Sequence, residues 1–207
     1  MAGEPDGSAF VRERYRENAR FFQREPALLS LLGFARLRRM VAAGAHGRTL
    51  EVAIGSGLNL PYYPPGIDLT GVDLSPEMLE YAKARARSLG IRADLEEADA
   101  AALPFADASF DTVTETFAGC TFPDPVAAYR EMRRVLRPGG VLLLAEHGRG
   151  DRTLVGKLLD RIAPGFYRGT ACNLNRDPVA LLRAAGWEPQ IKRRGIWGVL
   201  LALRAVR

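Results

Sequence analysis

The chain has 207 residues, of which 47% are hydrophobic and 26% charged, so it can bury the core of one domain and is not disordered. Its formal net charge of +5 comes mostly from arginines scattered among 24 acidic residues, which argues against a nucleic-acid partner. The sequence has neither a run of about 18 apolar residues nor a signal-peptide pattern, so we expect a soluble, cytoplasmic protein.

The first 48 residues differ in pattern from the rest of the chain. Val11 to Gln23 and Ala27 to Ala43 have a helical period and predict two helices. We therefore divide the chain into an N-terminal helical cap, residues 1–48, and a main domain, residues 49–207. The cap is expected to lie over the open edge of the core as a lid or substrate wall, and simple cover of the core is an equal alternative.

The main domain alternates short apolar runs with longer helical stretches. Helix start signals support this pattern, because Ser75 precedes Pro76 in a predicted helix that ends near Leu89. A second helix is predicted from Pro125 to Leu136. Such alternation is typical of a parallel sheet with crossover helices, that is, a doubly wound, Rossmann-like α/β fold. The predicted strands are Thr49–Ile54, Leu69–Asp73, Arg92–Ala98, Phe110–Thr116 and Val141–His147.

The last third of the chain predicts one helix followed by a hairpin. Asp177 is a capping residue, Pro178 suits the first helical position, and Gly186 ends the helix. Trp187 to Arg193 and Ile196 to Arg204 then predict two antiparallel strands. We therefore expect a mostly parallel sheet of seven strands that ends in an antiparallel hairpin.

Two basic clusters stand apart from the scattered arginines. They are Arg36 to Arg39, interrupted by Leu37, and Lys192 to Arg194. We interpret both as solvated faces, with attraction to an anionic lipid or substrate as the alternative. Membrane contact is therefore not expected, although these clusters leave it open, and the sequence leaves the oligomeric state open as well.

A glycine-containing turn follows the first predicted strand. Ligands of open parallel sheets bind at the carboxyl ends of the strands, and Gly55 and Gly57 would let the backbone approach such a ligand closely. Asp73 ends the next strand 18 positions after Gly55, a spacing at which a carboxylate reaches the ribose hydroxyls of a nucleoside. A dinucleotide site would want a third glycine where Leu60 stands, so a nicotinamide dehydrogenase is the weaker alternative.

Four segments together resemble the class I S-adenosylmethionine-dependent methyltransferases over residues 47–205. They are LEVAIGSGLN (50–59), GVDLSPEML (71–79), EADAAALPFADASFDTV (97–113) and EMRRVLRPGGVLLLAEHG (131–148). The family usually has glycine where this chain has Ala53, so the backbone there must accommodate a methyl group. Asn59 also replaces a frequent glycine. The resemblance implies S-adenosylmethionine as cofactor and a small-molecule methyl acceptor as partner.

The resemblance also assigns cofactor-binding residues one by one. Glu51 would hold the amino group of the methionine part through the loop, and Asp73 would take the ribose hydroxyls. Asp99 would accept from the adenine amine, although it could merely cap a turn, and Met78 could simply belong to the core. The full implied set is Glu51, Gly55, Gly57 and Asn59 in the glycine loop; Asp73, Leu74 and Met78 after the second strand; Asp99 and Ala100; Thr116; and Tyr15, on a helix that packs over the cofactor.

Two further stretches resemble one branch of that family. Cys172 to Asp177, and Glu146 with His147, are similar to the thiol S-methyltransferases of the methyltransferase-like family and to bacterial phospholipid N-methyltransferases. Quinone C-methyltransferases are more distant relatives with the same core. We therefore favour a thiol acceptor. The alternatives are O-, N- or C-methylation of a lipid or natural product, and a non-catalytic module that binds the nucleoside cofactor.

The few histidines and cysteines carry the remaining chemistry. His147, at the ligand end of a strand, is the candidate catalytic base or substrate orienter, with a purely structural histidine as the equal alternative. His46 is expected at the surface. Cys120 and Cys172 are too far apart in sequence for a CxxC motif and lack a neighbouring base. We therefore expect no metal site and no covalent role, although either thiol could line the acceptor pocket.

Overall fold

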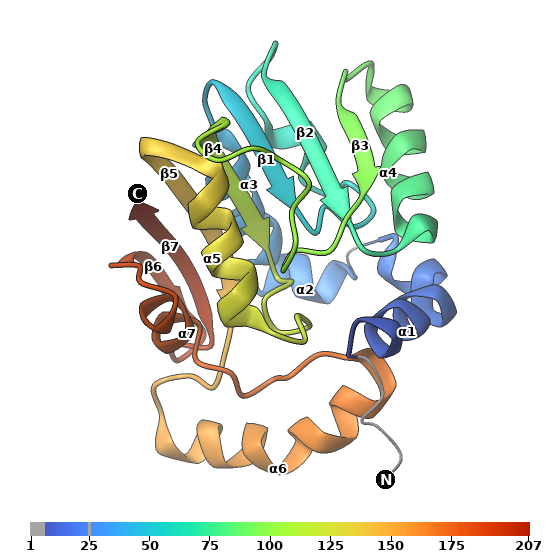
Figure 1. Cartoon of the computed structure of the whole chain (residues 1–207). Coiled ribbons are helices and arrows are strands. Elements are labelled where there is room, and N and C mark those ends of the chain that lie inside the picture. The colour runs from blue at the N-terminus through green and yellow to red at the C-terminus, as the bar shows by residue number, and fades with distance from the viewer. Residues whose placement is uncertain (1–6, 25) are drawn as a thin grey trace, which may run out of the picture.

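The computed structural model describes residues 7–24 and 26–207, so residues 1–6 and 25 of the predicted cap lie outside the described residues. One sheet has the strand order β3-β2-β1-β4-β5-β7-β6 (Figure 1). The pairs among β1 to β5 are parallel, whereas β7 is antiparallel to both β5 and β6, which confirms the predicted fold. The strands are β1 (Arg48–Val52), β2 (Asp68–Asp73), β3 (Asp94–Glu97), β4 (Phe110–Thr116), β5 (Leu136–His147), β6 (Gln190–Gly195) and β7 (Leu200–Val206).

The helices begin where side-chain caps direct them. The Ser75 hydroxyl accepts from the Met78 amide at the start of α4, and Asp124 and Asp177 cap α5 and α7 in the same way. Each of these three helices also has proline in its first turn. The helices are α1 (Gly7–Phe22), α2 (Ala27–Leu31), α3 (Phe34–Ala43), the 3₁₀ helix η1 (Leu60–Tyr62), α4 (Pro76–Leu89), α5 (Pro125–Val135), α6 (Thr153–Thr170) and α7 (Pro178–Ala184).

Helices cover both faces of the sheet. On one face α3 packs Leu37 and Val41 against β5 and β7. On the other face α5 and α7 enclose the largest core cluster, which includes Tyr129 and the fully buried Trp187. The Trp187 indole donates to the Tyr129 carbonyl at 2.9 Å, so this large side chain is buried with its polar atom satisfied.

The order of the strands fixes where a ligand can bind. The chain reverses direction across the sheet between β1 and β4, which are neighbours, and such a switch point opens a crevice at the carboxyl ends of the strands. In Figure 1 the arrowheads of β1, β2 and β4 point toward the region enclosed by α1, α2 and α6. The fold therefore places the ends of these strands under helices from both ends of the sequence.

The hairpin strands β6 and β7 begin three and four residues later than predicted, and three further elements differ from the sequence prediction. The helix predicted over Ala27–Ala43 is two helices, because Gly33 adopts a left-handed φ of 104° between them. The connection from β1 to β2 contains only η1 rather than a full crossover helix, since prolines at 61, 64 and 65 prevent a longer one. β5 starts at Leu136, five residues before the predicted Val141, because Leu136 already pairs with Phe110 of β4.

Helix α6 is an element that the sequence analysis does not predict. It has 18 residues, and it contains Pro164 together with Gly156, Gly165 and Gly169, which weaken the local helix signal. Its contacts with α1 hold it across the open end of the sheet, so tertiary packing rather than propensity explains it.

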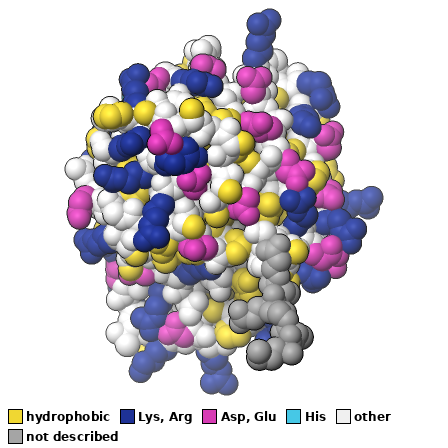
Figure 2. Space-filling model, in the orientation of Figure 1, with side chains coloured by type: hydrophobic (Ala, Val, Ile, Leu, Met, Phe, Trp, Pro, Cys, Tyr) yellow, Lys and Arg dark blue, Asp and Glu magenta, His cyan; other side chains and the backbone are white. Residues whose placement is uncertain are grey.

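The surface mixes charges of both signs. Figure 2 shows Lys and Arg side chains interspersed with Asp and Glu over the visible face. Among residues 7–24 and 26–207, no helix combines the length and the apolar character that a bilayer crossing requires.

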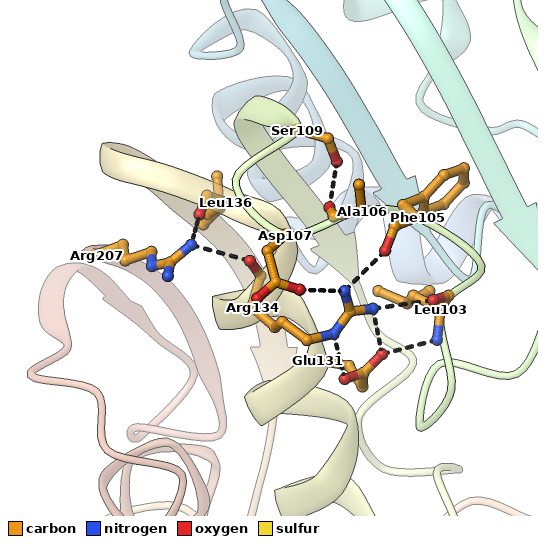
Figure 3. A network of polar contacts seen from close by, with 9 residues as sticks. All are labelled: Leu103, Phe105, Ala106, Asp107, Ser109, Glu131, Arg134, Leu136 and Arg207. Carbon is orange, nitrogen blue, oxygen red and sulfur yellow. Dashed lines mark hydrogen bonds and ion pairs between the residues drawn. The ribbon is translucent and has the colours of Figure 1, made fainter.

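A network around Arg134 ties the connection before β4 to α5 (Figure 3). The guanidinium donates to the carbonyls of Leu103 and Phe105 at 2.9 and 2.7 Å, and it also binds the carboxylates of Asp107 and Glu131. The Glu131 carboxylate in turn accepts from the Leu103 amide at 2.9 Å. One partly buried side chain therefore fixes the entry into the central strand β4.

We predict that Arg134→Ala lowers the free energy of unfolding by about 2 to 3 kcal/mol, because several charge-assisted hydrogen bonds are lost at once. Urea unfolding measures the change. Arg130→Ala on the same helix is the control, because this exposed side chain makes a single long contact of 3.5 Å. Equal effects of the two variants would contradict the network's role.

Candidate functional site

A cavity of about 470 Å³ lies at the carboxyl ends of the parallel strands. This volume is within the range of small-molecule sites. Helices α1, α2, α3 and α6 contribute walls, and the loops after β1, β2 and β4, with His147 at the end of β5, form the base. Most residues predicted for the site line this cavity: Tyr15, Gly55, Asp73, Leu74, Met78, Asp99, Ala100, Thr116 and His147. Glu51, Gly57 and Asn59 lie behind its wall rather than in its lining.

Asp73 lies at the centre of the cavity's base. Its Oδ2 accepts from the Gly55 amide at 2.8 Å and its Oδ1 from the Ser75 amide at 2.9 Å. A carboxylate has about four lone-pair sites, so acceptor capacity remains on both oxygens. The side chain is 8% exposed, and burial raises the pKa of Asp73 to about 6 against the opposing effect of these amides.

The turn after β1 has left-handed backbone at every second residue from 53 to 57. Gly55 and Gly57 have φ of 58° and 74°, as glycine permits, and a Cβ at Gly57 would lie 2.6 Å from the Leu60 side chain. Ala53 also has a φ of 54°, which is strained for a residue with a Cβ. The position where the resembling family has glycine therefore keeps the glycine conformation in this chain.

Glu51 is the centre of a buried polar cluster behind the cavity. Its two carboxylate oxygens accept from the Asn59 amide at 2.6 Å and the Tyr63 hydroxyl at 2.9 Å. Burial raises the pKa of Glu51 to about 7, although these hydrogen bonds oppose the shift. Asn59 also donates to the Thr116 hydroxyl at 2.9 Å, so hydrogen bonds through Asn59 connect Glu51 to Thr116, which lines the cavity.

Arg38 corrects one interpretation of the sequence. The cluster around it was expected to be a solvated face, but the Arg38 guanidinium donates to the Thr116 hydroxyl at 2.6 Å and lies over the Phe117 ring. It also lines the cavity, beside the Asn59 and Thr116 side chains. Sequence reasoning missed this residue because only the fold brings α3 against the end of β4.

Helix α1 closes the cavity above the ends of β2 and β3. The Ser8 hydroxyl donates to Asp99 Oδ2 at 2.8 Å, and Arg12 pairs with Glu97. Tyr15, one helical turn further on, faces the cavity and bonds to Thr121. Asp99 also accepts from the Ala101 amide at 2.8 Å, so it caps a turn and lines the cavity at the same time.

Two cysteines and a histidine meet at the far end of the same cavity. The Cys172 Sγ lies 3.2 Å from the Cys120 Sγ and 3.3 Å from the His147 Nε2. The sequence analysis found no base near either cysteine, but the fold places His147 beside Cys172. Among residues 7–24 and 26–207, these three form the one His, Cys, Asp or Glu group whose donor atoms are arranged for a metal ion.

The two thiols of this group have pKa values shifted in opposite directions. The contact with Cys120, followed by those with His147, lowers the pKa of Cys172 to about 5, while the same contact and burial raise the pKa of Cys120 well above its ordinary value. Burial opposes the charged imidazole, yet the hydrogen bond to Cys172 and the charge of Glu146 keep the pKa of His147 raised. Such perturbed groups in a cleft make it a candidate functional site.

Buried polar contacts hold the loop that carries Cys120. The Gly119 amide donates to Glu146 Oε1 at 2.8 Å, and Glu115 accepts from the Ala118 amide. Burial and the charge of Glu146 raise the pKa of Glu115 well above its ordinary value. A Cβ at Gly119 would lie 2.2 Å from the Tyr129 hydroxyl, so only glycine fits there.

The strain at Ala53 gives a test of the loop geometry. We predict that Ala53→Gly raises the free energy of unfolding by about 1 kcal/mol, because glycine removes the left-handed penalty. Ala118→Gly, on a buried alanine outside the left-handed set, should instead lower it. Calorimetric melting temperatures compare the two variants, and a destabilised Ala53→Gly protein would contradict the geometry.

The sequence is similar to those of known methyltransferases. Residues 50–144 match the sequence model of the family described as Methyltransferase domain. A Cereibacter sphaeroides phosphatidylethanolamine N-methyltransferase is 38% identical over 120 residues, covering 56% of this chain and 59% of that protein. A Renibacterium salmoninarum demethylmenaquinone methyltransferase is 37% identical, covering 70% of this chain and 64% of that protein. The chain therefore spans less than two thirds of the length of these relatives.

Solved structures share the fold across nearly the whole chain. A Thermotoga maritima structure described as a SAM-dependent methyltransferase superposes with a TM-score of 0.67 at 23% identity, covering 97% of this chain and 99% of that one. The strand order, the cavity at the switch point and the matched sequence family agree. Residues 50–144 are a methyltransferase domain by sequence, and the chain has the fold of the class I S-adenosylmethionine-dependent methyltransferases.

Proposed function

We propose that this chain transfers the methyl group of S-adenosylmethionine to a small, apolar acceptor and releases S-adenosylhomocysteine. The observation that carries the proposal is the hydrogen bond from the Gly55 amide to the Asp73 carboxylate at the base of the cavity. A buried carboxylate with spare acceptor capacity, beside a turn that adopts glycine conformations, suits the ribose of an adenosyl ligand. The proposed cap, residues 1–48, would close over that ligand through α1.

The adenosine end of the ligand would lie between β2, β3 and α1. Asp73 would accept from the two ribose hydroxyls, and Met78, which is 2% exposed and lines the cavity, would pack beside the adenine. Asp99 would accept from the exocyclic amine in place of the Ser8 hydroxyl that now donates to it. Cofactor entry would thus exchange one hydrogen bond from α1 for one from the ligand.

The methionine end would lie beside Thr116. The Arg38 guanidinium, already directed to the Thr116 hydroxyl, would pair with the ligand's carboxylate. Glu51 would act on the ligand's ammonium group through Asn59 and Thr116, because it is 1% exposed and does not line the cavity itself. Arg38 and Glu51, at the two ends of this hydrogen-bonded series, thus have charges opposite to those of the carboxylate and the ammonium group of an amino acid.

The acceptor would enter from the side of Cys120, His147 and Cys172. The cofactor supplies a methyl group already activated by a sulfonium, so the protein has to align the acceptor and exclude water. We favour a thiol, because it ionises readily and His147 lies where a base or orienting group would contact it. The names of the relatives support a phospholipid amine or a quinone as alternative acceptors.

Transfer of a labelled methyl group tests the proposal. The purified chain is incubated with methyl-labelled S-adenosylmethionine and a panel of alkyl and aryl thiols, phenols, phosphatidylethanolamine and a demethylated quinone. We expect label in the thiol product. Calorimetry with the cofactor and with NAD separates the remaining candidates: binding without transfer to any acceptor favours a cofactor-binding module, and binding of NAD alone would contradict the proposal.

We predict that Asp73→Asn weakens binding of S-adenosylmethionine by about 1.5 to 3 kcal/mol, because hydrogen bonds to a charged acceptor are lost. Calorimetry gives the two dissociation constants directly. Asp68→Asn at the exposed start of the same strand is the control and should bind as the unmodified chain does. Unchanged affinity in Asp73→Asn would remove Asp73 from the site.

The raised pKa of Asp73 also predicts how cofactor binding depends on pH. The ribose hydroxyls donate to the carboxylate form of Asp73. The affinity for the cofactor is therefore highest at pH values above the pKa of about 6, and at lower pH it falls by up to about tenfold per pH unit. Dissociation constants measured from pH 5 to 8 test this, with Glu51→Gln to remove the second group, whose pKa is about 7. A pH-independent affinity in Glu51→Gln would contradict the assignment.

A further inference from the structure

We propose that Cys120, His147 and Cys172 bind a single Zn²⁺ ion, with a fourth coordination position that opens into the proposed methyl-transfer cavity. All three residues line that cavity, so an ion among them would face the reaction space directly. The role of the open position rests on the proposed function, whereas the ion site itself does not. The residues that carry this site are separate from the carboxylates that would hold the cofactor.

The distances between donor atoms suit one small ion. The three donor atoms lie within 4.8 Å of one another, with Sγ to Sγ at 3.2 Å and Sγ to Nε2 at 3.3 Å. A tetrahedral ion with Zn–S bonds of about 2.3 Å and Zn–N bonds of about 2.0 Å separates its ligand atoms by about 3.5 to 3.8 Å. The two contacts of Cys172 would therefore widen by about 0.6 and 0.2 Å to admit the ion, while the third pair, Cys120 Sγ and His147 Nε2, lies within 4.8 Å.

The chemistry of the donors selects the kind of ion. Two thiolates and one imidazole are soft or intermediate ligands, which favour zinc over magnesium or calcium. Two thiolates also neutralise a divalent charge, which matters because Cys120 and Cys172 are 3% and 9% exposed. Three protein ligands without a fourth are typical of zinc sites that keep a position for water or substrate.

The surrounding hydrogen bonds hold the donors together before any ion binds. The Cys120 carbonyl accepts from the Asn173 backbone amide at 2.9 Å and from its side chain at 3.2 Å, so the residue after Cys172 is tied to Cys120. Arg176 donates to the carbonyls of Gly119 and Phe122 on either side of Cys120. The backbone of His147 is fixed by its pairing with Leu200 at the end of β5. Such preorganisation is what a metal site requires.

The open position would bind a thiol acceptor. With the ion bound, His147 is its ligand and no longer a base, so the thiol would lose its proton to solvent as its sulfur joins the ion. That sulfur would then form a bond to the methyl carbon while the bond between this carbon and the sulfonium breaks. The electron pair of the broken bond would stay on the cofactor sulfur, so no oxidant or reductant is needed and the ion keeps its charge.

A thiol pair 3.2 Å apart could instead form a disulfide, which needs a bond of about 2.05 Å. A disulfide would explain the two cysteines but gives no reason for the imidazole to contact Cys172. The third donor therefore favours the ion.

Cobalt substitution tests the site without cofactor or acceptor. The full chain, freed of metal with a chelator and kept reduced with a phosphine, is titrated with Co²⁺ and then with Zn²⁺. We expect one equivalent of cobalt to give the intense visible bands of a tetrahedral ion and a thiolate-to-cobalt charge-transfer band in the near ultraviolet. One equivalent of Zn²⁺ should remove both bands.

Variants identify the ligands. Cys120→Ser and Cys172→Ser should each weaken cobalt binding at least about tenfold and reduce the charge-transfer band. His147→Ala should weaken the visible bands, whereas His46→Ala, which removes the chain's other histidine at an exposed position, should change nothing. Circular dichroism and thermal melting check that each variant folds.

Failure of the site and failure of the proposed function give different results. The absence of tetrahedral cobalt bands in folded protein with two titratable thiols would overturn the site. So would bands that persist in both cysteine variants. Labelled methyl transfer that continues in excess chelator would leave the proposed function intact and remove the metal from it. Cobalt bands that a small thiol strengthens, in a chain without methyl transfer, would keep the site and refute the function.

Discussion

The contact between Asp73 and the Gly55 amide is the interaction on which the site depends. It joins the end of β2 to the turn after β1 across the switch point of the sheet, at 2.8 Å. The turn can adopt left-handed backbone at positions 55 and 57 because both are glycines, with Ala53 as a strained third position. Removing this contact would separate the two loops that form the base of the cavity. The proposed binding of an adenosyl ligand therefore depends on one buried carboxylate and the backbone it fixes.

Long-range contacts build the acceptor side from a different part of the chain. β4 and β5 end next to each other. The buried pair Glu115 and Glu146 anchors the loop after β4, which carries Cys120. The segment after α6 is then fastened to that loop by Asn173 and Arg176. The cofactor side and the acceptor side thus have separate supports, and both meet at Thr116 and the cavity that it lines.

Local rules in the sequence were sufficient for much of the fold and for placing most of the predicted cofactor residues around one cavity. The caps at Ser75 and Asp177, the glycine turn, and the acid at the end of β2 all act over short distances, and each lies where it was predicted. The same rules missed helix α6, whose glycines and proline hide it until packing against α1 is known. They also missed Arg38 and the group of Cys120, His147 and Cys172, because those contacts join residues 25 to 78 positions apart.

A crystal structure of the chain with S-adenosylhomocysteine tests the central claim most directly. The account predicts both ribose hydroxyls within hydrogen-bond distance of the Asp73 carboxylate, with the ligand sulfur turned toward His147 and Cys172. A ligand bound elsewhere in the molecule, or one whose ribose does not contact Asp73, would contradict it.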